Sequence, residues 1–352
     1  MNSNVSNIVA NINQYIFSHH KIGIDLGSFN TRISLQSRGV ILNEPSFIGF
    51  NNRTRQYLFF GREAKDIYGK APQFIKVIKP ISNAIIADFD GVVEMIKVYL
   101  TKSVSPYYPK TIIKPRLYAY TTTPTNATEV EQRAAEESLY KAGFTGVRII
   151  EKPLAVAAGT NQSILSKKPI FVLDIGAGIV EMAVIIMGGI VSSKTINTAG
   201  EYMDRALISY LNLKYGLIIG PQTAEKLKVE LFSYLDQKKT MLVRGKSLEN
   251  GLPKTIKVTT NDVKEALSPV INHISDGLKE FIETIPPETV DSVIKNGIVL
   301  SGALAIIGGL DKYLSHEIKI PITTAARPEM VTINGITELL TKEHLYKDFF
   351  IK

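Results

Sequence analysis

Hydrophobic and polar residues alternate along the chain in a pattern that predicts strands separated by helices. Between Lys21 and Ser46, short apolar runs are broken by turn residues near 28–30 and 37–39, which predicts three strands. Apolar residues at helical spacing predict helices near 89–101, 129–143, 153–158, 201–215, 221–235 and 261–284. Further apolar runs predict strands at 117–122, 147–150 and 297–300, a hairpin at 170–186 and a β-rich stretch at 240–260. This order of elements predicts an α/β fold with mixed sheets.

Two segments repeat one pattern, with Asp25 and Asp174 lying 149 residues apart. The segments KIGIDLGSFNTRISL and IFVLDIGAGIVEMAVI each contain an apolar strand, Asp-x-Gly with small residues, and a second apolar strand. Glycine in such a turn lets main-chain N–H groups approach an anion, and a nearby carboxylate can hold hydrated Mg²⁺. The repeat therefore predicts two related halves that hold a polyphosphate and its metal ion in a shared cleft.

A third segment adds to these hairpins. Residues 298–311, IVLSGALAIIGGLD, predict a strand, a small-residue turn and a helix from about Ile306 to Leu314. A helix N-terminus after such a turn can bind a phosphate or pack against a base.

Composition narrows the class of protein. The 352 residues are enough for about two domains, and 45% hydrophobic with 21% charged residues is typical of a globular chain. The sequence has no apolar run of membrane-spanning length, and its first twenty residues, without Lys or Arg, are unlike a secretory signal. Cysteine is absent, which is compatible with a reducing cytoplasm.

The net charge of +8 has two interpretations. It favours anionic lipid, nucleic acid or an acidic partner, or it reflects a lysine-rich proteome. The sequence has no helix-turn-helix, zinc-finger or RNA-recognition signature, so we expect no nucleic-acid partner.

Residues 1–20 form a segment of their own, predicted as an amphipathic helix. Its apolar positions recur at helical spacing: Val5, Ile8, Val9, Ile12, Tyr15 and Ile16. Its polar face carries asparagine and glutamine, whereas membrane-surface helices carry Lys or Arg there. Three interpretations stay open: docking on a membrane or partner, packing on the chain's own domain, and disorder.

The three glycine-containing segments resemble, in order, the first phosphate, second phosphate and adenosine motifs of the actin superfamily. Within it the chain resembles the bacterial actin MreB family. Further segments match in register: NEPSF, IKVIKPISNAIIADFD, KPRLYAYTTTPTNATEVEQRAAEESLYKAG, IIEKPLAVAAG and YGLIIGPQTAEKLKVE. The resemblance covers about residues 21–340 and is greatest to the divergent MreB paralogues of wall-less Spiroplasma.

The resemblance implies an α/β, actin-like fold of two duplicated domains. Each has a mixed sheet flanked by helices, and four subdomains surround a cleft for ATP or ADP. After the extension at 1–20, the first domain would comprise 21–160 and 330–352, with a small subdomain at about 48–80 that holds a polar turn and a short helix. The second would comprise 161–329, with a small subdomain at about 198–260.

The resemblance also implies roles for single residues. Asp25 and Asp174 would position Mg²⁺. The phosphates would be surrounded by backbone at Gly27, Ser28, Phe29, Asn30, Gly176, Ala177 and Gly178. Glu225 and Lys228 would reach the ribose and adenine, although their spacing alone fits an ordinary surface ion pair. Gly302 and Ala303 would lie beneath the nucleoside.

The chain departs from the family pattern in three places, two that concern the attacking water and one that concerns the base pocket. Lys152 occupies the position where the family usually has a glutamate that orients the attacking water, and a protonated lysine cannot accept a hydrogen bond. Ile179 and Val180 replace two threonines, and the adenosine turn keeps only Gly302 of its usual glycines, followed by Ala303 and Leu304. We expect Lys152 to lie near the terminal phosphate and hydrolysis to be slow; the alternative is a solvent-facing lysine without a role.

The loop at 102–116 places Ile112 and Ile113 within a ring of basic residues, which suits insertion into an anionic leaflet. In MreB the matching loop inserts into the membrane; the alternative is that both isoleucines begin a buried strand. The resemblance further implies paired protofilaments formed with ATP, possible copolymers with other MreB paralogues, and a location in the cytoplasm at the inner face of the cell membrane. Cell shape and motility are the expected roles.

Two other functions of the superfamily remain as alternatives. A small-molecule kinase would need a substrate pocket and a carboxylate base, and Lys152 argues against the usual one. A chaperone-type ATPase would carry a further substrate-binding domain, whereas this sequence stops at Lys352.

Overall fold

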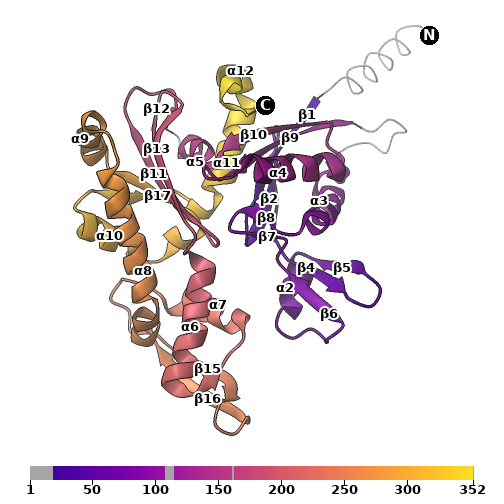
Figure 1. The fold of residues 1–352 in the computed structure, drawn as a ribbon, viewed down its shortest axis with the longest axis vertical. Helices are drawn as coiled ribbons and strands as arrows, with labels where there is room; N and C mark the ends of the chain where they lie inside the picture. The colour runs from indigo at the N-terminus through magenta and orange to yellow at the C-terminus, as the bar shows by residue number, and fades with distance from the viewer. Residues whose placement is uncertain (1–18, 108–114, 161, 352) are drawn as a thin grey trace.

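The computed structural model describes residues 19–107, 115–160 and 162–351, and Figure 1 shows their fold. Most of the predicted N-terminal extension, and Ile112 and Ile113 of the predicted membrane loop, lie outside the described residues. The described chain contains two five-stranded mixed sheets, each with helices on both faces and each extended by a smaller sheet.

The first sheet has the strand order β10-β9-β1-β2-β3. Its strands are β1 (His19–Leu26), β2 (Asn30–Leu35), β3 (Gly39–Pro45), β9 (Arg116–Thr123) and β10 (Gly146–Glu151). β1 is antiparallel to β2 and parallel to β9. One face packs on α3 (Phe89–Ser103) and α4 (Glu129–Ala142) through an apolar core. The three strands predicted between 21 and 46 are confirmed.

The second sheet has the strand order β13-β12-β11-β17-β18. Its strands are β11 (Ile170–Ile175), β12 (Val180–Ile186), β13 (Gly189–Ile196), β17 (Ile298–Ser301) and β18 (Ile322–Thr324). The outer face packs on α8 (Thr260–Glu283), α9 (Pro287–Asn296) and α10 (Leu310–Ile318). β11 is antiparallel to β12 and parallel to β17, the same relation that β1 has to its neighbours. The predicted duplication therefore appears as a repeated sheet topology.

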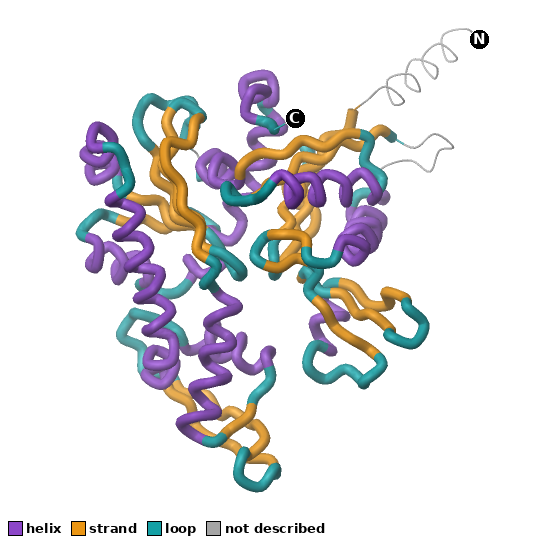
Figure 2. Tube along the Cα trace, viewed as in Figure 1, coloured by secondary structure: helices purple, strands orange, loops and turns teal. Residues whose placement is uncertain are grey.

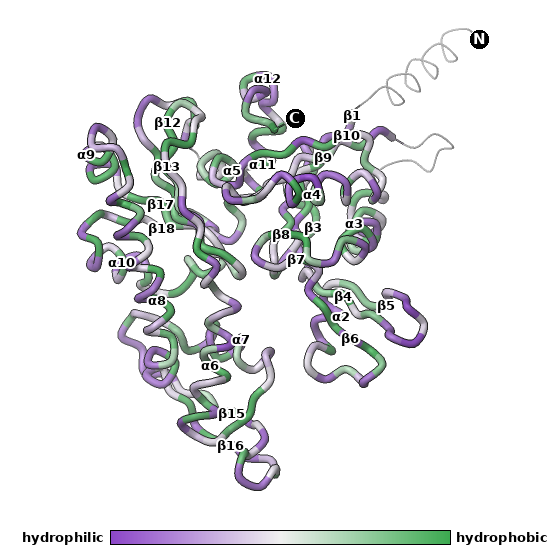
Figure 3. The backbone as a smooth tube through the Cα atoms, in the orientation of Figure 1, coloured by the Kyte–Doolittle hydropathy of each residue, from purple (hydrophilic) through white to green (hydrophobic). Residues whose placement is uncertain are grey.

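Two helices pack between the sheets and join them. These are α5 (Lys152–Gly159) and α11 (Val331–Thr341), and their apolar residues share one core with strands of both sheets. Figure 3 shows apolar positions in green along the central strands and polar positions in purple at the tips of the outer loops. This shared core holds the two sheets in a fixed position relative to one another.

Two small lobes extend from the sheets, and both lie at the lower end of the view in Figure 2. One contains β4 (Ile48–Asn51), β5 (Gln56–Phe60), β6 (Ile75–Ile78) and α2 (Arg62–Ile67). The other contains α6 (Gly200–Tyr215), β14 (Leu217–Ile218), α7 (Pro221–Leu231), β15 (Thr240–Ser247) and β16 (Pro253–Thr259). We call them the α2 lobe and the α7 lobe. The remaining elements are short: β7 (Ile81–Ser82), β8 (Ile85–Ile86), α12 (Glu343–Tyr346) and 3₁₀ turns at 105–107, 303–306, 328–330 and 347–349.

One predicted helix begins at a different residue in the structure. The helix expected from Ile306 to Leu314 is a 3₁₀ turn at Ala303–Ile306 followed by α10, which begins only at Leu310. Gly309 caps α10 with φ of 77°, a left-handed conformation that interrupts a continuous helix. The predicted helix 221–235 also ends earlier, at Leu231.

Candidate nucleotide-binding site

A cavity of about 490 Å³ is lined by residues of the two sheets and of the α7 lobe. Its size is typical of a small-molecule site. Its wall includes every residue predicted to surround a nucleotide: Asp25, Gly27, Ser28, Phe29, Asn30, Lys152, Asp174, Gly176, Ala177, Gly178, Glu225, Lys228, Gly302 and Ala303. The structure therefore brings these residues together, and their individual roles stay predictions.

The two repeated hairpins have the same register. Asp25 on β1 pairs with Arg32 on β2, and Asp174 on β11 pairs with Glu181 on β12. Directly opposite residues of an antiparallel pair point to the same face of the sheet. The first hairpin thus presents an acid beside a base, and the second presents two acids side by side.

Lys152 contacts both acids of the second hairpin, Asp174 and Glu181. It is the first residue of α5, where the following Pro153 suits the first helical turn. Its ammonium lies 2.6 Å from Asp174 Oδ2 and 3.4 Å from Glu181 Oε2. The side chain is only 13% exposed, so the alternative of a solvent-facing lysine is wrong.

The charge on Lys152 is stabilised by these carboxylates. Burial acts to lower the pKa of Lys152, but Asp174 and Glu181 outweigh it and the pKa is raised above its ordinary value. The ammonium therefore remains protonated at neutral pH and cannot act as a general base. Burial also raises the pKa of Glu181, an effect that Lys152 opposes. The backbone N–H of Thr125 donates to Glu181 Oε1 at 3.1 Å.

The predicted metal-holding carboxylates both have partners. Arg32 Nη1 donates to Asp25 Oδ2 at 3.0 Å. Asp174 contacts Lys152 through Oδ2 and accepts a hydrogen bond from the Ser301 hydroxyl at Oδ1, at 2.7 Å. Both oxygens of Asp174 therefore have a partner in the described structure.

The phosphate hairpins face each other closely. Ser28 on the first hairpin accepts a hydrogen bond at Oγ from the Ala84 backbone N–H, at 2.8 Å. Gly178 on the second hairpin lies against Ser28 and Asn83 with no room for a side chain. The Phe29 ring contacts Phe47 edge to face, with the Lys65 ammonium 4.3 Å from its centroid.

Glu225 and Lys228, both on α7, make contacts that the sequence did not indicate. Glu225 forms an ion pair at 2.8 Å with Lys65, which joins the α7 lobe to the α2 lobe. The buried Lys228 ammonium lies 2.7 Å from Asp204 and donates to the Gly200 carbonyl at 2.8 Å. The interpretation of Glu225 and Lys228 as a surface ion pair with each other is therefore wrong.

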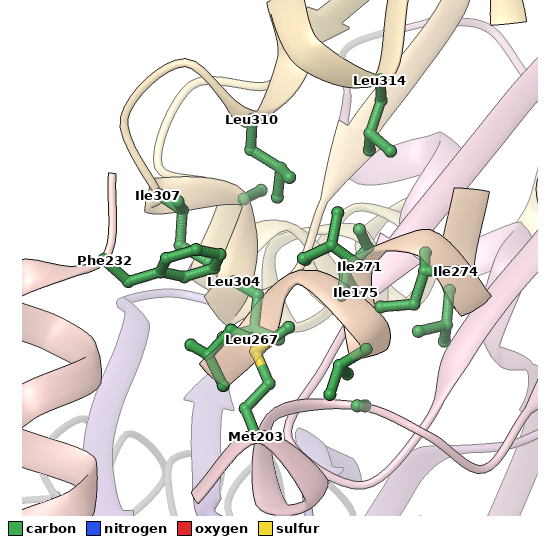
Figure 4. Close-up of a cluster of buried hydrophobic side chains, with 14 of the residues drawn as sticks. Ile175, Met203, Phe232, Leu267, Ile271, Ile274, Leu304, Ile307, Leu310 and Leu314 are labelled. Atoms are coloured by element: carbon green, nitrogen blue, oxygen red, sulfur yellow. The ribbon is translucent and has the colours of Figure 1, made fainter. Parts of the chain in front are cut away.

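Part of the cavity wall is apolar. Phe232, Leu304 and Ile307 line it and also belong to the core around α8, as Figure 4 shows. Gly302 and Ala303 form the adjoining turn. The cavity wall thus combines the charged residues of the hairpins with apolar residues, and it also includes Glu230, Gln237 and Lys239.

Sequence reasoning missed Arg32, Asp204 and the contact between Lys65 and Glu225. Arg32 could have been found, because it follows Asp25 by the same seven positions that separate Glu181 from Asp174. The other contacts join residues from separate elements, and no local pattern indicates them.

Comparisons with known proteins decide the family. The profile of the MreB/Mbl protein family matches residues 19–348, nearly the whole chain. This chain belongs to the MreB/Mbl family. The cell shape-determining protein Mbl of Bacillus subtilis (strain 168) is 35% identical over 310 residues, which cover 87% of this chain and 91% of Mbl.

Solved structures agree with membership in the MreB/Mbl family. MreB5 of Spiroplasma citri, solved with ADP and with AMPPNP, has a TM-score of 0.88 at 27% identity, covering 94% of this chain and 98% of the ADP-bound chain. The MamK double helical filament has a TM-score of 0.75 at 18% identity, covering 92% of this chain and 99% of MamK, and shows the fold alone. The predicted actin-like fold is confirmed. Within the described part of this MreB/Mbl chain, no helix combines the length and apolarity needed to cross a membrane.

Proposed function

We propose that this chain is an ATP- and ADP-binding cytoskeletal protein that forms filaments and hydrolyses ATP slowly. The observation that carries the proposal is the cavity closed by two Asp-x-Gly hairpins in matching register. It is supported by the similarity to MreB5 of Spiroplasma citri, which was solved with ADP and AMPPNP.

In this proposal the backbone N–H groups at 27–30 and 176–178 surround the phosphates. Gly302 and Ala303 lie beneath the nucleoside, and the apolar residues of the wall, Phe232, Leu304 and Ile307, accept the base. Glu225 reaches the ribose while Lys65 holds it, and Lys228 supports the wall through Asp204. Mg²⁺ would be held between Asp25 and Asp174 through its waters.

Slow hydrolysis follows from the groups around Lys152. A buried ammonium stands where a water-orienting carboxylate would act, and the neighbouring Ile179 and Val180 offer no hydroxyl. Lys152 would instead contact the terminal phosphate and favour nucleotide binding by charge. The side chains near the phosphates thus favour holding ATP over cleaving it.

The proposed cellular role and location rest on membership in the MreB/Mbl family. Mbl of Bacillus subtilis, a member of the same family, is named for cell-shape determination. We infer that this chain self-associates into paired protofilaments, alone or with other MreB paralogues, in the cytoplasm at the inner face of the cell membrane. Cell shape and motility are the proposed roles.

Electron microscopy tests the filament proposal directly. Purified protein with ATP is expected to form filaments that are absent without nucleotide. A lack of filaments across a range of salt and Mg²⁺ concentrations would contradict the proposal and favour a small-molecule kinase or a chaperone-type ATPase.

Gly178→Ala is expected to weaken ADP binding about tenfold. A Cβ at this position would lie 2.7 Å from Ser28 Oγ and 2.9 Å from Asn83 Cα, and so would push the two hairpins apart. Overpacking of this kind costs about 1–3 kcal/mol, and 1.4 kcal/mol is tenfold in affinity. Isothermal titration calorimetry with ADP measures the change. Gly220→Ala is the matched control, because a Cβ there meets nothing within 4 Å; equal affinities in the two variants would contradict the proposed position of the phosphates.

The proposed membrane contact involves Ile112 and Ile113. The double change Ile112→Ser, Ile113→Ser is expected to reduce binding to anionic liposomes more than tenfold, since burying one such side chain contributes about 1.5–3 kcal/mol. Liposome pelleting measures it, with Leu242→Ser, an exposed leucine of the α7 lobe, as control. Unchanged binding of the double variant would overturn the loop hypothesis.

A further inference from the structure

The α2 lobe and the α7 lobe face each other through the helices α2 and α7 (Figure 1) and are joined by two ion pairs. Lys65 of α2 pairs with Glu225 of α7 at 2.8 Å, and the Lys65 carbonyl accepts a hydrogen bond from the Gln222 side chain. Lys79, which follows β6, pairs with Glu201 of α6 at 3.3 Å. Both bases come from the α2 lobe and both acids from the α7 lobe, so the facing surfaces are complementary in charge.

These ion pairs join lobes that have no apolar core in common. Of the three apolar cores among the described residues, one contains Ile48 of the α2 lobe and another contains Leu227 of the α7 lobe, but none contains residues of both. Gly69 beside Pro221 adds a small van der Waals contact. The ion-paired side chains are 19–24% exposed, so water and salt reach them. Because an interface without a large apolar core permits relative motion, the lobes are held together by contacts that can open and close.

The contacts between the lobes extend to the cavity. Phe29 and Glu225 both line it. The Lys65 ammonium lies 4.3 Å from the centroid of the Phe29 ring, and the Lys79 ammonium lies 5.6 Å from the same centroid, within the range of cation–π interactions. Glu225 is held to the α2 lobe, whereas Phe29 belongs to the first hairpin. Separation of the lobes therefore breaks these contacts and widens the cavity on this side.

We propose that the Lys65–Glu225 and Lys79–Glu201 ion pairs form a latch that slows the release of a bound nucleoside diphosphate. The inference rests on the nucleotide binding proposed above and concerns the regulation of that site. The nucleotide leaves when the lobes separate, as in other sites where the opening of a lid limits product release. The release rate therefore follows the strength of the ion pairs and rises with the salt concentration.

The test is the rate at which N-methylanthraniloyl-ADP leaves the full chain after excess ADP is added, measured by stopped flow in Mg²⁺. Release from the wild type is expected to become faster between about 50 mM and about 500 mM salt, because ions screen partly exposed pairs. Glu201→Gln is expected to release the analogue about fivefold faster at low salt, the change that one partly exposed ion pair supplies, and to respond less to salt. Among the described residues, neither Lys79 nor Glu201 lines the cavity, so this variant keeps the proposed nucleotide contacts.

Glu280→Gln is the matched control for Glu201→Gln. Its ion pair with Lys194, at 2.6 Å, joins α8 to β13 and does not connect the lobes, so its release rate should equal that of the wild type. Lys79→Arg keeps the positive charge and should also stay near the wild-type rate. Lys79→Gln should match Glu201→Gln, because either change breaks the same ion pair.

The outcomes separate the latch from the proposed function. No binding of the analogue in Mg²⁺ would overturn the proposed function. Binding with a wild-type release rate that is the same at both salt concentrations would overturn the latch alone, and this measurement needs no variant to fold. A Glu201→Gln variant that is folded by circular dichroism melting and releases the analogue at the wild-type rate would also overturn the latch, as would equal acceleration by Glu280→Gln.

Discussion

Replacing Lys152 by methionine is expected to lower the free energy of unfolding by about 3–5 kcal/mol, because removing one partner of a buried ion pair leaves the other charge uncompensated. Asp174 and Glu181 are both almost fully buried, and Lys152 is the ammonium that contacts them in the described structure. Methionine keeps most of the side-chain length and removes the charge. Urea unfolding of the nucleotide-free protein measures the loss.

The control for this change is Lys97→Met. Lys97 forms an ion pair with Glu94 at the surface of α3, and its side chain is 46% exposed. Such pairs contribute about 0–1 kcal/mol, so this variant should unfold close to the wild type. If the two methionine variants lost equal stability, Lys152 would not lie between Asp174 and Glu181 in the folded protein.

Phosphate release by the wild type is expected to be about 10²–10⁴-fold slower than by Mbl of Bacillus subtilis measured alongside it, the range that a positioned base supplies. Lys152→Glu should raise the rate, although not to that of Mbl, since Ile179 and Val180 still lack hydroxyls. A coupled assay of phosphate release over several hours is sensitive enough to compare the three proteins.

Lys152→Gln is the matched variant for this experiment. It removes the ammonium without adding a carboxylate, so its rate should stay near that of the wild type. If Lys152→Gln and Lys152→Glu rose together, loss of the cation and not gain of a base would explain the rate. A wild type as fast as Mbl would contradict slow hydrolysis altogether.

The central strands β11 and β12 could be predicted from the sequence, whereas their neighbour β13 could not. β11 and β12 are buried almost throughout, and their continuous apolar runs indicate a central hairpin. β13 beside them was missed, because most of its positions are exposed or half-buried and it contains serine and lysine. α11 was also missed: it packs between two sheets and is apolar on most sides, so it lacks the polar face that marks a surface helix.

In the candidate site, the local motifs could be predicted from the sequence, and the contacts between distant residues could not. Glycine and aspartate of the hairpins are recognisable because a turn and its chemistry lie within a few residues. The ion pair of Lys65 with Glu225 joins positions 160 residues apart, and only the folded chain places them together. The sequence likewise showed that Lys152 departs from the family pattern, but its contacts with Asp174 and Glu181 depend on how α5 meets the second sheet.

A structure of the protein crystallised with ATP and Mg²⁺ tests the central claim most directly. The account predicts intact ATP between the hairpins, its phosphates against 27–30 and 176–178, and the Lys152 ammonium in contact with the terminal phosphate. An empty cavity, phosphates bound elsewhere, or Lys152 turned away from the nucleotide would contradict it.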